Sequence, residues 1–149
     1  MASRKLKLSP DITYDYTLFG IACHMKDYRF TFFLNEKLGF RFKRMNDLKL
    51  KEGEEERYYS FFMYHHPDER RNYYLVSNYH EAGRLIPTEK GVDFFVIADD
   101  ILSAMQKKNL ITKVQAVQQV LAVYEIPLIK ARNLDIIFQE IEMHFLEGN

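Results

Sequence analysis

The stretch RLIPTEKGVDFFVIADD, residues 84–100, combines a rigid turn residue, an apolar run and an acidic pair. Its centre, residues 92–98, is almost wholly apolar and rich in Val, Ile and Phe, which predicts a strand covered on both faces. The acidic pair, Asp99 and Asp100, comes before apolar residues at helical spacing, so we expect one of the two carboxylates to cap a helix. Those apolar residues are Ile101, Leu102 and Met105.

Upstream of this stretch, the pattern predicts one strand and one helix. Residues 11–22, DITYDYTLFGIA, alternate apolar and polar side chains with the period of two that is typical of a half-buried strand. Residues 26–40, KDYRFTFFLNEKLGF, place apolar side chains three and four positions apart, and Gly39 follows where a helix end commonly needs a left-handed residue. The apolar stripe of this predicted helix is Phe30, Phe33, Leu34 and Leu38.

The middle of the chain predicts several strands. Residues 40–43, FRFK, alternate, and residues 46–57, NDLKLKEGEEER, indicate a short strand end followed by a loop, because the acidic run is too polar to be buried. Residues 57–64 and 72–78 have strand composition, and the segment HHPDERR between them contains turn residues. We therefore expect a hairpin here.

The C-terminal third predicts a helix, a strand and a last helix. Residues 109–127 combine a helical stripe with strand composition, and we divide them into a helix to about Val117 and a strand from about Gln119. Residues 133–148 repeat large apolar side chains at helical spacing, which predicts an amphipathic helix. Its stripe is Leu134, Ile137, Phe138, Ile141 and Phe145.

This order of elements predicts a single α+β domain over residues 1–149. A βαβ unit near each end of a mainly antiparallel sheet, with two helices on one face, is the plan of ferredoxin-like and ACT-like sandwiches. The hairpin extends that sheet, and the C-terminal helix is an addition to the plan. Because this architecture hosts enzymes, regulators and RNA binders alike, it says little about activity.

Composition and charge narrow the classes of partner and compartment. Lys plus Arg equals Asp plus Glu at 21 each, so no global field favours a polyanion. The lone Cys23 has no cysteine to pair with in a disulfide, which fits a reducing compartment. The start of the chain lacks the apolar segment of a secretory signal, and no apolar run is long enough to span a bilayer. We expect a cytoplasmic protein without a membrane partner.

Two segments together resemble the IPExxxVDY family of small bacterial proteins. The family motif corresponds to IPTEKGVDF, residues 86–94, and the block at residues 18–40 is similar to the family's second well-marked region. This chain has Thr88 where the motif has Glu, and Phe94 where it has Tyr. The family has no assigned activity, so the resemblance, which extends over roughly residues 18–126, implies a class of protein and no mechanism.

Asp93 is the first candidate site residue, because a carboxylate beside a buried strand is costly unless it is hydrogen-bonded or paired. The favoured interpretation is structural: Asp93 ties down the turn at Pro87 through backbone amides, or it binds a nearby Arg. The other interpretation gives Asp93 a ligand-binding or catalytic role.

The start of the first predicted helix supplies the other candidate binding residues. Asp27 is expected to be its N-cap, with Lys26 and Arg29 facing solvent around Tyr28. The alternative is that the helix-start amides, together with Lys26 and Arg29, bind an anionic group. The first interpretation is favoured, because a capping carboxylate already satisfies those amides.

The predicted hairpin offers a surface for RNA or for a partner protein. Tyr59, Phe61 and Tyr64, flanked by Arg70 and Arg71, have the composition of a stacking platform with phosphate-binding edges. Alternatively, one face of the hairpin is core and the other meets the final helix or a partner protein. The balanced charge and the acidic run nearby favour this second interpretation.

The remaining motifs predict no metal and no cofactor. Adjacent His65 and His66 on a strand end point to opposite faces, so a polar turn is favoured over a metal site. Cys23 beside His24 suggests a thiol with its base, but neighbours in an extended chain diverge, so Cys23 is expected to be a small core residue. The chain contains no P-loop, nucleophile elbow or dinucleotide fingerprint.

We therefore expect a non-catalytic protein-binding or regulatory module, whose partner is another protein or its own copy. An RNA- or nucleotide-binding module that uses the aromatic hairpin is the alternative, and an enzyme with a pocket near Asp93 is the third possibility. An exposed aromatic row favours RNA, whereas a row covered by the last helix favours packing. A concave pocket with converging polar groups around Asp93 favours the enzyme.

Overall fold

The computed structural model describes residues 6–9, 12–80, 83–128, 137–139 and 141–143. Residues 137–139 and 141–143 are helical. The other elements are β1 (Leu6–Ser9), β2 (Ile12–Tyr14), β3 (Thr17–Cys23), α1 (Asp27–Leu38), β4 (Lys43–Arg44), β5 (Leu48–Glu52), β6 (Glu55–Tyr59), β7 (Phe61–His66), β8 (Arg71–Ser77), β9 (Phe94–Ala98), α2 (Ala104–Gln115) and β10 (Val120–Ile126).

The centre of the fold is a six-stranded antiparallel sheet with the order β10-β3-β9-β8-β7-β4. Residues 94–98 of the apolar run form β9, which lies between β3 and β8, and all five residues of β9 are buried. This confirms the prediction of a strand covered on both faces. The fold is α+β with a mostly antiparallel sheet, as expected, and β7 and β8 form a hairpin. The strand predicted over residues 57–64 is divided at Ser60, because its first residues belong to β6.

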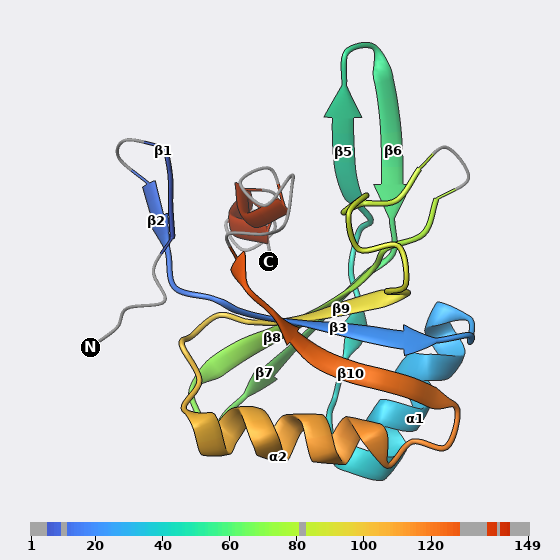
Figure 1. The fold of residues 1–149 in the computed structure, drawn as a ribbon, viewed down its shortest axis with the longest axis vertical. Coiled ribbons are helices and arrows are strands. Elements are labelled where there is room, and N and C mark those ends of the chain that lie inside the picture. The colour runs from blue at the N-terminus through green and yellow to red at the C-terminus, as the bar shows by residue number, and fades with distance from the viewer. Residues whose placement is uncertain (1–5, 10–11, 81–82, 129–136, 140, 144–149) are drawn as a thin grey trace.

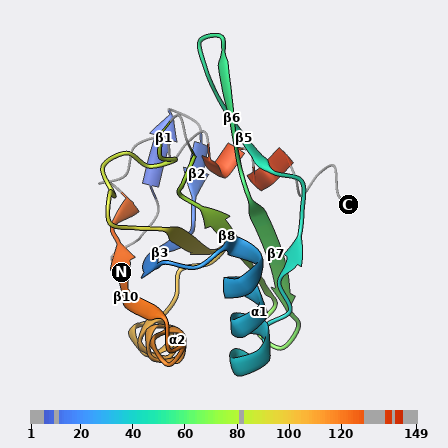
Figure 2. The ribbon, with the colours of Figure 1, turned by 90° about the vertical axis from the view of Figure 1, so that its right-hand side faces the viewer.

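Different elements cover the two faces of the sheet (Figures 1 and 2). On one face, α1 and α2 pack on a core cluster that includes Phe30, Leu34 and Val114. On the other face, the β5–β6 hairpin and the helical residues near the C-terminus enclose a second cluster that includes Leu48 and Phe138. The sheet is therefore sandwiched between two separate cores.

The strand predicted over residues 11–22 is broken in two. β2 pairs with β1 in a small separate sheet, whereas β3 pairs with β9 and β10 in the main sheet. β3 is buried on both faces, not on one. Gly20 allows this packing, because a Cβ atom there would lie 2.7 Å from Ile126 Cδ1 and 2.8 Å from Val92 Cγ2.

Residues 46–57 were predicted as a short strand end followed by a loop, but residues 48–57 instead belong to a hairpin. β5 and β6 pair from Leu48 and Tyr59 to Glu52 and Glu55, and Gly53 has the positive φ of 61° that the tight turn requires. Alternate side chains of the hairpin, including Leu48 and Tyr59, are buried. Residues 53–56 of the acidic run are exposed, as expected, because they form the tip.

The predicted ends of α1 and α2 agree with the structure, whereas the predicted start of α2 does not. α1 ends at Leu38 with Gly39 in the left-handed conformation, as predicted, and α2 and β10 confirm the division of residues 109–127. The start of α2 was placed too early: Ser103 is its N-cap, in a capping box with Gln106. Met105 is accordingly 73% exposed and outside the core.

The described part of the last helix packs on its own chain. Ile137, Phe138 and Ile141 are buried in the core with Tyr16, whose ring centroid lies 4.3 Å from that of Phe138. Leu134 and Phe145, which belong to the predicted stripe, lie outside the described residues. Among the residues described, no helix has the length and apolar character needed to cross a membrane.

Candidate functional site

The site brings three predicted residues together at one end of the sheet. A cavity of about 580 Å³ lies where β3 and β8 end and where α1, β7 and β9 begin. We call it the sheet-end pocket. Its lining consists of Cys23, His24, Met25, Lys26, Asp27, Ser60, Ser77, Tyr79, Asp93 and Phe94.

Asp93 holds the end of β3, not the turn at Pro87. Its Oδ2 atom accepts a hydrogen bond from the Cys23 amide at 2.9 Å and lies 4.0 Å from His24 Nε2. The structural interpretation predicted backbone amides as partners, but the amide that Asp93 binds belongs to a strand 70 positions away. Its Oδ1 atom has no hydrogen bond within the described residues, and 28% of the side chain is exposed.

Asn78 is the residue that anchors the Pro87 turn. It is fully buried, and its Nδ2 donates to the carbonyls of Glu89 and Val92 at 3.0 and 2.9 Å. Its Oδ1 accepts the Ile86 amide at 2.8 Å. Sequence reasoning missed Asn78 because it looks like an ordinary turn residue at a strand end, and only its complete burial shows that it needs these partners. Pro87 itself does not line the sheet-end pocket.

The carboxylate at the start of α1 is already engaged. Lys26, not Asp27, is the N-cap, and Asp27 is the first helical residue. Asp27 Oδ1 accepts the Tyr28 amide at 2.6 Å, and Asp27 Oδ2 forms an ion pair with Arg44 at 3.4 Å. A negative charge in the first turn stabilises the helix dipole. The Asp27 carboxylate therefore occupies the start of α1, where the anion-binding alternative would place the ligand.

The other residues of the predicted helix-start site divide between the pocket and the outer surface of α1. Lys26 lines the pocket, is exposed, and has no ion pair in the described part of the chain. Tyr28 is 68% exposed, and the guanidinium of Arg29 lies 5.8 Å from the Phe33 ring centroid. Neither Tyr28 nor Arg29 lines the cavity.

Cys23 is a core thiol, as predicted. It is 1% exposed, and its burial, followed by the negative charge of Asp93, raises the pKa of the thiol to about 11. A thiol with this pKa is protonated at neutral pH and is a poor nucleophile. Within the described residues, no hydrogen bond joins His24 to Cys23 or to either serine of the pocket, and His24 is 80% exposed.

The predicted stacking platform lies inside the protein. Tyr59 and Phe61 are fully buried, and Tyr64 is 8% exposed. The Tyr59 hydroxyl donates to the Gly83 carbonyl at 2.9 Å, and the Phe61 ring stacks on Tyr74. Their burial gives no support to the RNA-binding alternative and agrees with the favoured interpretation that the hairpin packs in the core. Both faces of the sheet are covered, so alternate aromatic residues enter one core or the other.

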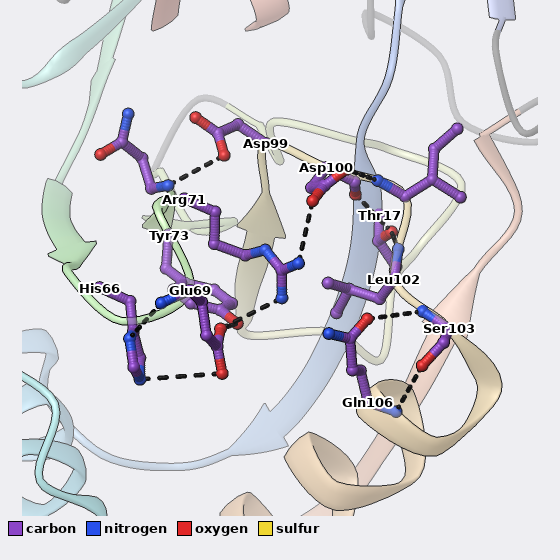
Figure 3. A network of polar contacts seen from close by, with 12 residues as sticks. Thr17, His66, Glu69, Arg71, Tyr73, Asp99, Asp100, Leu102, Ser103 and Gln106 are labelled. Atoms are coloured by element: carbon purple, nitrogen blue, oxygen red, sulfur yellow. Dashed lines mark hydrogen bonds and ion pairs between the residues drawn. The ribbon is translucent and has the colours of Figure 1, made fainter.

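Arg71 is also buried, in a polar network at the far end of β9 (Figure 3). Its Nη1 lies 3.1 Å from Glu69 Oε1, and its Nη2 lies 2.9 Å from Asp100 Oδ2. The Tyr73 hydroxyl donates to Glu69 at 2.6 Å. Burial, followed by this hydrogen bond, raises the pKa of Tyr73 to about 12. Arg71 is thus not a phosphate-binding edge; Arg70, the other predicted flank, is exposed.

The acidic pair after β9 belongs to this network and caps no helix. Asp99 Oδ1 accepts the Asn72 amide at 2.9 Å, and burial raises the pKa of Asp99. The Asp100 carbonyl accepts the Thr17 hydroxyl at 2.8 Å, and Thr17 Oγ1 in turn accepts the Leu102 amide at 3.0 Å. The network therefore ties the link between β9 and α2 to β3 and β8 (Figure 3).

No group of three or more His, Cys, Asp or Glu side chains able to hold a metal ion occurs among the residues that the structure describes. Comparisons of the chain with protein-family models, curated proteins and solved structures find no significant match. The resemblance to the IPExxxVDY family stays a prediction. The function is therefore inferred from the geometry of the site.

Proposed function

We propose that the protein is a non-catalytic protein-binding module that receives a polar segment of a partner protein in the sheet-end pocket. The observation that carries this proposal is the convergence of Lys26 and Asp93 on one cavity, each with polar atoms that no described residue engages. The cavity of about 580 Å³ is of the size that binding sites have.

The lining defines the chemistry of the segment that fits. Asp93 Oδ1 is an open acceptor, and Tyr79, which also lines the cavity, is 62% exposed. A partner's Lys or Arg side chain satisfies both, because the carboxylate accepts its hydrogen bonds and the aromatic ring attracts its charge. Lys26 supplies a cation for an acidic group on the same segment.

Exposed aromatic residues extend this surface along α1. Tyr28 directly follows the pocket residue Asp27, and Phe32 lies one helical turn further on; they are 68% and 57% exposed. Aromatic residues are enriched in protein interfaces and supply most of their binding energy. This surface supports a protein partner over a free small molecule, because a small ligand in the cavity leaves both rings uncovered.

The competing functions have less support. The nucleic-acid alternative depended on Tyr59, Phe61 and Tyr64, which are buried. The enzyme alternative gains the pocket near Asp93 but lacks an activated nucleophile, because the Cys23 thiol is buried and its pKa is raised.

The finer assignments of fold, family and location belong to the same proposal. A ferredoxin-like or ACT-like plan is supported by the strand order β10-β3-β9-β8 and by α1 and α2, which follow β3 and β9 and pack on the same core cluster. Membership of the IPExxxVDY family rests on the motif at residues 86–94. A cytoplasmic location is supported by the lone, reduced Cys23.

Affinity capture from extracts of the organism's own cells tests this function. Wild-type protein is compared with Lys26→Glu, Tyr79→Ala and the control Lys108→Glu, which changes an exposed residue of α2. We expect a defined partner to be retained by wild type and control and lost by both pocket variants, with unfolding midpoints unchanged. Purified partner then gives the affinities directly.

Partners that bind all four proteins equally contradict the proposal. If the captured protein is a second copy of the same chain, light scattering on wild type and Tyr79→Ala shows whether the pocket forms the contact. If Tyr79→Ala remains fully dimeric, the contact between the two copies lies outside the pocket. This result refutes the proposal that the pocket binds a second copy of the chain.

A further inference from the structure

A second cavity, of about 830 Å³, lies at the other end of α1. It is lined by the edge strand β4, the end of β7 and the turn after β7. We call it the β4–β7 pocket. It shares no lining residue with the sheet-end pocket. Its lining consists of Gly39, Arg41, Lys43, Met45, Met63, Tyr64, His65, His66, Pro67 and Asp68.

Two cations of this lining are available to a ligand. Phe40 and Phe42 are buried in the core beneath the helices, so Arg41 and Lys43, which alternate with them, are exposed on the opposite side of the chain. Neither the Arg41 nor the Lys43 side chain has a hydrogen bond or an ion pair within the described residues. The neighbouring Arg44 differs, because it is paired with Asp27 and Asp47.

The floor of the same pocket is apolar. Met45 and Met63 are partly buried against the core cluster on this face of the sheet, and Met63 lies opposite Lys43 in the β4–β7 pair. Unbranched Met side chains adapt to ligands of irregular shape. His65 and His66 add polar groups at the rim, and Asp68 is the one acidic residue of the lining.

We propose that the β4–β7 pocket binds a small organic anion, with a carboxylate, sulfonate or phosphate group attached to an apolar body. Arg41 and Lys43 bind the anionic group, the guanidinium through its fork of donors and the ammonium as a point charge. The apolar body lies on Met45 and Met63. This inference does not depend on the proposed protein-binding function, because the two sites use different residues.

A fluorescence titration with 8-anilinonaphthalene-1-sulfonate tests the pocket, because this probe joins a sulfonate to an aromatic body. The uncharged N-phenyl-1-naphthylamine is the matched probe without the anion. We expect one sulfonate probe to bind per chain and millimolar inorganic phosphate to weaken its binding. Lys43→Gln and Arg41→Gln should each weaken the sulfonate probe about fivefold, the ratio for loss of one exposed charge pair, and leave the uncharged probe unchanged.

Two further variants keep the test decisive. Asp68→Asn removes the acidic residue of the lining and should strengthen binding of the sulfonate probe about twofold to threefold. Lys108→Gln on α2 is the control and should change neither probe. The proposal is overturned if the Arg41→Gln, Lys43→Gln double variant binds the sulfonate probe as wild type does. The proposal is also overturned if this double variant loses binding of both probes while its unfolding midpoint is unchanged.

Discussion

The two ends of β9 both carry acidic residues, but the structure uses them differently. At the far end, Asp99 and Asp100 are engaged by the Asn72 amide and by the buried Arg71. At the near end, Asp93 holds one amide with one oxygen and leaves the other open in the sheet-end pocket. The difference separates carboxylates that are engaged within the fold from one that is available to a partner.

The near end can leave Asp93 available because a neutral residue does the structural work there. Asn78 holds the loop that enters β9 through three side-chain hydrogen bonds. At the far end the connection is charged, because the guanidinium of Arg71 joins the β7–β8 turn to Asp100. A neutral anchor imposes no charge on its surroundings, whereas a buried cation requires carboxylates nearby.

Replacing Asn78 is expected to have the largest effect. Asn78→Ala leaves the Ile86 amide and the carbonyls of Glu89 and Val92 without their buried partner, so the free energy of unfolding should fall by about 3–4 kcal/mol. Urea unfolding measures this loss. Asn109→Ala is the control, since Asn109 is exposed on α2. A loss below that of the control would show that Asn78 is not the anchor of this end.

Replacing Arg71 should have the next largest effect. Arg71→Met preserves the apolar part of the side chain but leaves Glu69 and Asp100 without their cation, so the free energy of unfolding should fall by about 2–3 kcal/mol. Arg70→Met, at the exposed neighbouring position, is the control and should cost less than about 0.5 kcal/mol. Equal effects of the two changes would mean that the network contributes no more than an exposed charge.

Asp93→Asn tests whether the near end is available for binding. The Asn side chain still accepts the Cys23 amide, but without charge assistance, so the free energy of unfolding should fall by only about 1 kcal/mol. Partner affinity, measured by calorimetry well below the unfolding midpoint, should fall at least about tenfold, because the open carboxylate is lost. If affinity is unchanged in a folded variant, Asp93 is as structural as the carboxylates at the far end.

The smallest effect is expected from Asp99 and depends on pH. Burial raises the pKa of Asp99 in the folded protein, so the ionised form destabilises the fold and stability is gained as pH falls through that raised pKa. Asp99→Asn retains an acceptor for the Asn72 amide and removes the titration. The variant should be slightly more stable than wild type at neutral pH, and the difference should vanish once the pH falls below the pKa of an aspartate in the unfolded chain. Thermal unfolding across this pH range would contradict the assignment if the two curves stay parallel.

Local periodicity predicted most elements but misplaced the start of α2. The acidic pair after β9 has the composition of a helix cap, yet Ser103 performs that role. Its capping box with Gln106 provides hydrogen-bond acceptors for the backbone amides of both residues. Residues 46–57 were also misassigned in part. Leu48 and Leu50 alternate with charged residues, and this short alternation was too weak to predict the β5–β6 hairpin. At both positions the local sequence was compatible with two backbone structures, and tertiary packing determined which one forms.

The sequence predicted three residues of the candidate site but neither their contacts nor the participation of Tyr79. Lys26, Asp27 and Asp93 were identified from their local settings, and the structure shows that all three line one cavity. The role of Asn78 was not foreseen, and the burial of Tyr59 and Phe61 was favoured over exposure without being decided. A polar or aromatic residue on a strand has the same pattern whether its face is covered or open.

The sequence by itself determined the buried central strand β9, the helix α1 with its glycine end, the β7–β8 hairpin and the amphipathic stripe of the last helix. These features depend on side-chain periodicity and backbone preferences, which act over a few neighbouring residues. Only the tertiary structure decided the partner of each carboxylate, because Asp93 meets an amide 70 positions away and Asp100 meets Arg71 across 29 positions. The strength of such a contact depends on distance and burial in space, and neither quantity is contained in a local pattern.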